Sequence, residues 1–144
     1  MKSIIIVSGH GNYATGIKSA FELLAGPNEN FSFIDFTTSD SEETLGLKFS
    51  REINKNMNAP ILFFCDIIGG TPFKTAALIA NDKDNMEVVA GCNLVSLIEA
   101  SFQDENMPIR ELAESVVNSS INSTSLFKKV KINEVKYVET ESGI

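Results

Sequence analysis

Short, continuous apolar segments alternate along the chain with segments of helical spacing, and this alternation limits the possible folds most strongly. The first apolar segment, SIIIVS at 3–8, is rich in β-branched residues, which is typical of a strand buried on both faces. Further strands are expected at 31–36, 59–67 and 85–91. Strands that alternate with helices in this way predict an α/β fold with a mainly parallel sheet.

Helices are expected between the strands from the spacing of the apolar residues. Leu45, Phe49 and Ile53 share one helical face, and Asp40 with Glu43 predicts a capping box that begins this helix. The other expected helices run over 14–25, from Pro72 to about Asn81, over 93–102, and from Pro108 to a polar break at 118–125.

The crossover rules predict how these elements are arranged. Right-handed crossovers favour the doubly wound strand order 2-1-3-4 with helices on both faces. The first and third strands are then neighbours, and ligands bind at such a switch point, beyond the carboxyl ends of the strands. The length fits one domain over 1–144, with a core at 2–121 and a C-terminal extension at 122–144 that holds a last strand or hairpin at 127–139.

Composition excludes several classes of function. The chain is 43% hydrophobic and 22% charged, with a formal net charge of −7 and scattered Lys and Arg, which argues against nucleic-acid binding. No apolar run is long enough to span a membrane and no signal-like leader is found, so a cytoplasmic protein is expected. Cys65 and Cys92 lie in apolar runs and are expected to be buried thiols, with no metal site.

The only histidine, His10, follows the first strand between Gly9 and Gly11. Asp66 lies at the end of the third strand, so the predicted strand order brings both residues to the same crevice. A carboxylate that accepts a hydrogen bond from one imidazole nitrogen leaves the other nitrogen as a nucleophile. Ser8 is either a strand-end residue or a second hydrogen-bond partner in this site.

The segment GGTP at 69–72 predicts an anion site beside these two residues. Thr71 is a favourable N-cap and Pro72 fits the first position of a helix. Gly69 and Gly70 expose the backbone before this helix, and free N–H groups at a helix N-terminus attract phosphate. Together, the nucleophile His10, the orienting Asp66 and this anion site predict phosphoryl transfer through a phosphohistidine.

Each of these features has a simpler interpretation when taken alone. A single His in a turn is often only a polar loop residue, Asp66 can be a turn cap, and GGTP can be only a turn before a helix. Other functions also fit the fold: an anion-, FMN- or partner-binding module, a phosphatase or mutase, or a regulator that reports sugar supply through its phosphorylation. The convergence of His10, Asp66 and Thr71 favours phosphoryl transfer.

Four segments carry a resemblance to a known family: IIIVSGHG, FIDF, ILFFCDIIGGTPFKTAA and EVVAGCNLVSLIEA. Over residues 2–121 the sequence resembles the EIIA components of the mannose-type sugar phosphotransferase system (PTS). The resemblance implies that His10 accepts a phosphoryl group from phospho-HPr and passes it to an EIIB component. It implies that Asp66 hydrogen-bonds this histidine, that Thr71 lies near the phosphate, and that Gly91 and Asn93 line the surroundings.

The resemblance also implies partners. A separate EIIB polypeptide is expected, the membrane components EIIC and EIID are expected to act only indirectly, and no metal or organic cofactor is needed. A homodimer is implied in which residues 130–138 pack as an antiparallel edge strand on the partner's sheet. The transported sugar is not indicated, because selectivity resides in the membrane components.

Overall fold

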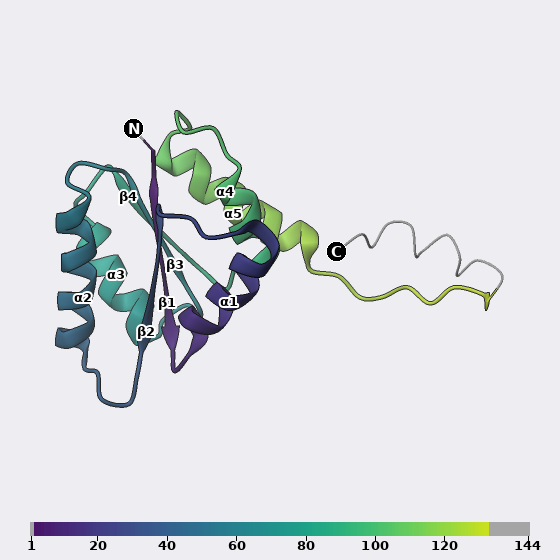
Figure 1. Ribbon diagram of the computed structural model, residues 1–144, viewed down its shortest axis with the longest axis horizontal. Coiled ribbons are helices and arrows are strands. Elements are labelled where there is room, and N and C mark those ends of the chain that lie inside the picture. The colour runs from purple at the N-terminus through teal and green to yellow at the C-terminus, as the bar shows by residue number, and fades with distance from the viewer. Residues whose placement is uncertain (1, 133–144) are drawn as a thin grey trace.

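A four-stranded parallel sheet forms the centre of the computed structural model, which describes residues 2–132 (Figure 1). The strand order is β2-β1-β3-β4, so the predicted α/β class and the order 2-1-3-4 are confirmed. The strands are β1 (Ile4–His10), β2 (Phe31–Phe36), β3 (Ile61–Cys65) and β4 (Met86–Ala90).

Helices cover both faces of this sheet, as the crossover rules predict. In Figure 1, α2 and α3 lie on one face, and α1, α4 and α5 lie on the other. Their bounds are α1 (Tyr13–Ala25), α2 (Glu42–Lys55), α3 (Thr71–Ala80), α4 (Leu94–Ser101) and α5 (Ile109–Ser123).

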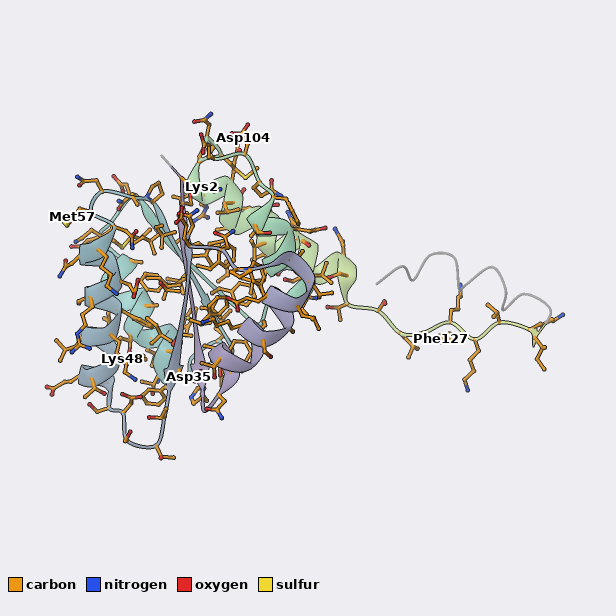
Figure 2. The ribbon with its side chains drawn as sticks, viewed as in Figure 1. Lys2, Asp35, Lys48, Met57, Asp104 and Phe127 are labelled. Atoms are coloured by element: carbon orange, nitrogen blue, oxygen red, sulfur yellow. The ribbon has the colours of Figure 1, made fainter. Side chains whose placement is uncertain are left out.

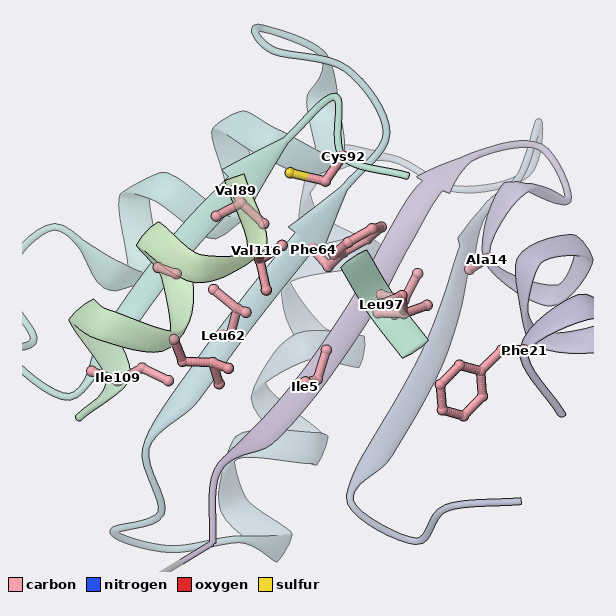
Figure 3. Packing of buried hydrophobic residues seen from close by; sticks show 13 residues of the cluster. Ile5, Ala14, Phe21, Leu62, Phe64, Val89, Cys92, Leu97, Ile109 and Val116 are labelled. Atoms are coloured by element: carbon pink, nitrogen blue, oxygen red, sulfur yellow. The ribbon is translucent and has the colours of Figure 1, made fainter. Parts of the chain in front are cut away.

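Successive residues of β1 contribute to two separate cores, which explains its continuous apolar sequence. Ile4 and Ile6 pack in the cluster on the α2 and α3 face, whereas Ile5 and Val7 pack in the cluster shown in Figure 3. Because side chains alternate along a strand, His10 belongs to the face of Ile4 and Ile6. The core packing of β1 therefore sets the side of the sheet on which the histidine lies.

The helix α2 begins one residue later than the predicted capping box. Ser41 is the N-cap, and its hydroxyl accepts from the Thr44 N–H at 3.2 Å while the Thr44 hydroxyl accepts from the Ser41 N–H at 2.8 Å. Asp40 instead accepts from Lys48 Nζ at 2.8 Å and from the Thr37 N–H at 2.9 Å. The predicted Asp40–Glu43 box is therefore wrong, because the Asp40 carboxylate is held by Lys48 of α2, which is labelled in Figure 2, and by the Thr37 N–H.

The last helix continues into the polar break that the sequence predicts at 118–125 and ends at Ser123. Ser120 and Ser123 donate to the carbonyls four residues earlier, at 2.9 and 2.7 Å, and the Ser120 hydroxyl oxygen also lies 2.8 Å from the Ser96 hydroxyl of α4. The hydroxyls of these serines therefore have hydrogen-bond partners within α5 and on the neighbouring α4. The polar residues do not end the helix, which extends to Ser123.

Beyond α5 the chain leaves the body of the domain (Figure 1). Residues 124–131 form no helix or strand, so the last strand that we expect at 127–139 is not present in its described part. Residues 133–139 of that prediction lie outside the described residues. In the range 2–132, none of the helices combines the length and apolar character that crossing a bilayer requires.

The capping box gives a test of how α2 begins. Ser41→Ala should lower the free energy of unfolding by about 1 kcal/mol, because the Thr44 N–H loses its acceptor. Ser50→Ala is the control, since Ser50 is exposed on the same helix and Ala is the better helix former. Urea unfolding measures both variants, and equal effects would show that Ser41 is not the cap.

Candidate functional site

The sequence-predicted site residues lie at the carboxyl edge of the sheet, in the loops that follow the strands. β1 continues two residues further than predicted and ends at His10, whereas β3 ends at Cys65. Asp66 is therefore the first residue after β3, which pairs directly with β1. The strand pairing brings the two residues together across 55 intervening positions in the sequence.

A carboxylate oxygen of Asp66 binds His10 twice. Asp66 Oδ2 lies 2.7 Å from His10 Nδ1 and accepts from the His10 backbone N–H at 2.9 Å. The other oxygen, Oδ1, accepts from the Ile67 N–H at 2.9 Å. An ionised carboxylate can only accept, so Nδ1 carries the proton and Nε2 presents its lone pair. The His10 side chain is 45% exposed, so the ring is partly open to a reactant.

The environment of Asp66 keeps it ionised. Burial raises the pKa of this carboxyl, but the hydrogen bonds from His10 and Ile67 favour the charged form and outweigh burial. The pKa of Asp66 therefore lies below its ordinary value. At neutral pH the carboxylate holds the imidazole and can stabilise positive charge on it.

The loop that carries Asp66 is fixed to both neighbouring strands. The Asp66 N–H donates to the Ser8 carbonyl at 3.2 Å, and the Gly91 N–H donates to the Asp66 carbonyl at 3.0 Å. Gly69 turns the loop toward α3 with a φ of 79°, a conformation that residues with a Cβ resist. The carboxylate is thus positioned before any ligand arrives.

Two further residues, Gly70 and Phe36, lie against the imidazole ring of His10. A Cβ added to Gly70 would lie 2.7 Å from His10 Cε1, so only glycine lets the ring approach the start of α3. The Phe36 ring lies 5.7 Å from the imidazole, centroid to centroid, with the planes at 89°. Sequence analysis did not select Phe36; its place at the end of FIDF, on the strand next to His10, was the available signal.

The N-terminus of α3 differs in detail from the prediction. Gly70 is the N-cap, Thr71 is the first helical residue and Pro72 the second, so Thr71 does not cap the helix as expected. The backbone at Gly70 is extended, with a φ of −75° and a ψ of 170°. The loop therefore ends, and α3 begins, one residue earlier than the sequence predicts. The Thr71 hydroxyl makes no hydrogen bond with residues 2–132 and is available to a ligand.

The glycines beside His10 have separate packing roles. A Cβ on Gly9 would lie 2.6 Å from Cγ of Tyr13, so this glycine lets α1 begin against β1. The Gly11 N–H donates to the Phe36 carbonyl at 2.8 Å and extends the pairing with β2. Burial and the charge of Asp66 raise the pKa of Tyr13 to about 12, so its hydroxyl stays protonated at neutral pH.

Ser8 and Asn93 have mainly structural contacts. Ser8 is fully buried, and its carbonyl contacts the site by accepting a hydrogen bond from the Asp66 N–H. Asn93 caps α4 by accepting from the Ser96 N–H at 3.1 Å, and its amide donates to the Ser120 carbonyl and to the Ser123 hydroxyl. The Asn93 side chain therefore joins α4 to α5, while Gly91 is the member of that segment that contacts Asp66.

Both cysteines are buried free thiols, as predicted. Burial and the nearby charge of Asp66 raise the pKa of Cys65 to about 12, and burial also raises the pKa of Cys92. Neither thiol ionises at neutral pH, so neither supplies a thiolate nucleophile.

Gly70→Ala tests whether the lack of a side chain at Gly70 sets the position of the His10 imidazole. The added methyl group should displace the ring and weaken its bond to Asp66, changing the ¹⁵N shifts of His10 Nδ1 and Nε2. Gly16→Ala is the matched control, because a Cβ on Gly16 meets open space on a helix and should stabilise the fold by about 0.5–1 kcal/mol. An unchanged His10 spectrum in Gly70→Ala would contradict this account.

The low pKa of Asp66 predicts a dependence of stability on pH. A depressed pKa means that the ionised carboxylate stabilises the folded state; this contribution is complete above the unfolded value of about 3.9 and is lost as pH falls through the folded value. The stability advantage of the parent chain over Asp66→Asn should therefore shrink as the pH falls below about 4. Urea unfolding of both proteins at each pH measures this advantage. A difference in unfolding free energy that stays constant with pH would contradict the lowered pKa of Asp66.

Comparison with known proteins agrees with this geometry. The model of the EIIA-man family, described as the PTS system fructose IIA component, matches residues 3–117. The chain is 32% identical over 130 residues to the mannose-specific EIIAB component of Escherichia coli K12, covering 89% of this chain but only 40% of that protein. It is also 32% identical to the sorbose-specific EIIA component of Lacticaseibacillus casei, covering 90% of this chain and 94% of that protein.

A solved structure shows the same fold. The mannose/sorbose-specific IIA subunit from Enterococcus faecalis superposes with a TM-score of 0.84 at 23% identity, covering 92% of this chain and 99% of that one. The family match extends over most of the described residues and includes His10, Asp66 and the start of α3. The chain therefore belongs to the mannose-type EIIA family of the sugar phosphotransferase system.

Proposed function

We propose that this protein is a phosphocarrier of a sugar-uptake phosphotransferase system and that His10 carries the phosphoryl group. The observation that supports this most directly is the imidazole itself. Its Nδ1 lies 2.7 Å from Asp66 Oδ2, while the part of the ring that carries Nε2 lies beside Gly70 at the start of α3 and the side chain is 45% exposed. A nucleophile, an orienting carboxylate and an anion-attracting helix end therefore meet at one edge of the sheet.

The proposed reaction is a direct transfer between two imidazoles. The lone pair of His10 Nε2 attacks the phosphorus atom of a phosphohistidine on the donor, phospho-HPr, whose other ring nitrogen carries a proton. The new Nε2–P bond forms as the donor's N–P bond breaks, and the donor nitrogen leaves with that electron pair as a neutral imidazole. His10 keeps the Nδ1 proton, so its ring becomes a phosphorylated imidazolium whose positive charge lies 2.7 Å from Asp66.

The start of α3 supplies an electrostatic cradle for the phosphoryl oxygens. The first N–H groups of a helix have no intrahelical acceptor and lie at the positive end of its dipole. In α3 these include Thr71 and Phe73, because Pro72 has no N–H. The Thr71 hydroxyl is free to donate to the same oxygens. These neutral donors hold the group without an ion pair, which suits a carrier that must release it.

Release is the reverse reaction with a different acceptor. An EIIB component would attack the phosphorus atom on His10, and the Nε2–P bond would break to regenerate the neutral imidazole. The same exposed nitrogen serves both steps, so HPr and EIIB would use this face in turn. The relay would take place in the cytoplasm, and the transfer needs no metal or organic cofactor.

We also propose a homodimer, joined by the C-terminal segment. β4 is an edge strand, and open hollows of about 430 and 420 Å³ flank it on its α5 and α3 sides. Leu126, Phe127 and Ile132 are at least 64% exposed on the segment that leaves the domain. The lysines of this segment would approach Glu87 and Glu114, which line the hollow on the α5 side. Residues 130–138 of one subunit would add a strand to β4 of the other.

Phosphoryl uptake tests the proposed function. Incubation with phosphoenolpyruvate, enzyme I and HPr should add one acid-labile phosphoryl group to the parent chain at His10, measured by intact mass and peptide mapping. His10→Gln should take up none while keeping its fold. Asp66→Ala should keep the acceptor but react about 10²-fold more slowly, because it loses the group that orients the ring. Labelling of His10→Gln would contradict the assignment.

Sedimentation equilibrium tests the dimer. Ile132→Ser should weaken association of the full chain, because it removes a highly exposed apolar side chain from the proposed strand at 130–138. Leu23→Ser is the control, since Leu23 is 87% exposed in the last turn of α1. A parent chain that sediments as a monomer would overturn the proposed dimer and leave the proposed phosphoryl transfer intact.

A further inference from the structure

Phe36 lies against the ring of His10 on the face of the sheet that α2 and α3 cover. The two residues are partners in the register of β1 against β2, and their ring centroids are 5.7 Å apart with the planes at 89°. Perpendicular aromatic rings at this distance place the edge of one ring against the face of the other. The chemical effect of the contact therefore depends on which ring presents its edge.

The strand order indicates that His10 presents the edge. Nδ1 of the imidazole lies 2.7 Å from Asp66 Oδ2, and Asp66 follows β3. The strands β3 and β2 lie on opposite sides of β1. Because Nδ1 and Cδ2 are the two ring neighbours of Cγ, the edge that carries Cδ2 is turned away from Asp66, toward β2 and the Phe36 ring. The imidazole is thus held between a carboxylate on one edge and an aromatic face on the other.

This arrangement responds to charge on the imidazole. The face of a phenyl ring is negative, and it attracts a cation that lies within about 6 Å of its centroid. In the proposed transfer the His10 ring changes from a neutral imidazole to a positive imidazolium, while the phosphoryl oxygens are held at the start of α3. The Phe36 face, at 5.7 Å, therefore attracts the ring more strongly after the transfer than before it.

A simpler role for Phe36 is packing alone. Its side chain is half-buried and packs against the core cluster on the α2 and α3 face. Packing depends on the size of the phenyl ring and not on its charge distribution, so the two roles separate when the charge is changed at constant shape. Phe33, on the same strand and also half-buried, packs against the cluster on the opposite face and is a matched control.

We propose that Phe36 is a positioning residue of the phosphoryl transfer, whose negative face holds the Cδ2 edge of His10 and stabilises the phosphorylated, positively charged ring. Asp66 and Phe36 then act on opposite edges of the imidazole, and both favour its charged form. Neither of them occupies Nε2, which is left to the phosphoryl group. The proposal rests on the proposed function, because the charged ring arises in that transfer.

Proton chemical shifts of the unphosphorylated full chain test the geometry. A proton above an aromatic face is shielded by the ring current, so the Cδ2 proton of His10 should move downfield in Phe36→Leu. Phe33→Leu should leave this signal in place, because Phe33 packs on the other face of the sheet. The same Cδ2 proton shift in the parent chain and in Phe36→Leu would overturn the edge-to-face contact that the proposal requires.

The phosphoryl equilibrium with HPr tests the effect of charge. The full chain is mixed with phospho-HPr without enzyme I, and the phosphorylated fraction of each protein is measured by intact mass. Replacement of Phe36 by phenylalanines with an increasing number of ring fluorine atoms nearly preserves the size of the ring and progressively weakens its negative face. The equilibrium constant toward phosphorylated His10 should fall along this series, and it should be about two- to fivefold lower in Phe36→Leu.

Phe33→Leu is the control for this equilibrium and should keep the parent value. An equilibrium constant that stays the same along the fluorinated series would overturn the proposal, because packing alone would then explain Phe36. The fluorinated series decides between the two roles even if Phe36→Leu does not fold. Thermal unfolding verifies that each protein is folded at the assay temperature.

The outcomes separate this proposal from the proposed function. If the parent chain is phosphorylated on His10 and the equilibrium does not respond to fluorination, the role of Phe36 is overturned while the phosphocarrier function stands. If the parent chain takes up no phosphoryl group from phospho-HPr, the proposed function fails, and the role of Phe36 in the transfer fails with it.

Discussion

The hydrogen bond between His10 Nδ1 and Asp66 Oδ2 is the interaction on which the site depends. It joins the ends of two neighbouring parallel strands, and it exists because β1 pairs with β3 rather than with β4. The bond fixes the proton on one ring nitrogen and leaves the other as a nucleophile. The loop hydrogen bonds and the absence of a side chain at Gly70 serve to hold these two groups in place.

The same arrangement combines rigidity with access. Asp66 is 12% exposed and held by several hydrogen bonds, whereas the His10 side chain is 45% exposed. The proposed relay would need this combination, because the orienting group must not move while the proposed acceptor nitrogen meets two different proteins. The donors at the start of α3, the Thr71 and Phe73 N–H groups and the Thr71 hydroxyl, are neutral, so they would hold a phosphoryl group without the ion pair that a lysine or arginine would form.

The sequence predicted the fold well where its signals are periodic. The buried strands, the helix faces and the strand order follow from apolar spacing and crossover rules, and His10 and Asp66 follow from the strand ends. It failed where neighbouring polar residues compete for the same role. Asp40 is as good an N-cap type as Ser41, and only the position of Lys48 decides that its carboxylate is used elsewhere.

Two further differences have the same origin. Serines at 118–125 indicate a break when read locally, but Ser96 of α4 and the carbonyls of α5 give them hydrogen-bond partners within a helix. The contact between Phe36 and His10 depends on the register of β1 against β2, which no local pattern records.

The sequence by itself determined the α/β class, the strand order and the placement of His10 and Asp66 at neighbouring strand ends, because each depends on residue type and on spacing along the chain. Only the tertiary structure decided which residue caps α2, where α5 ends, and how Gly70 and Phe36 enclose the imidazole. These features depend on contacts between residues distant in the sequence. Several side chains can satisfy the same donor or fill the same space, and the packed chain selects one of them.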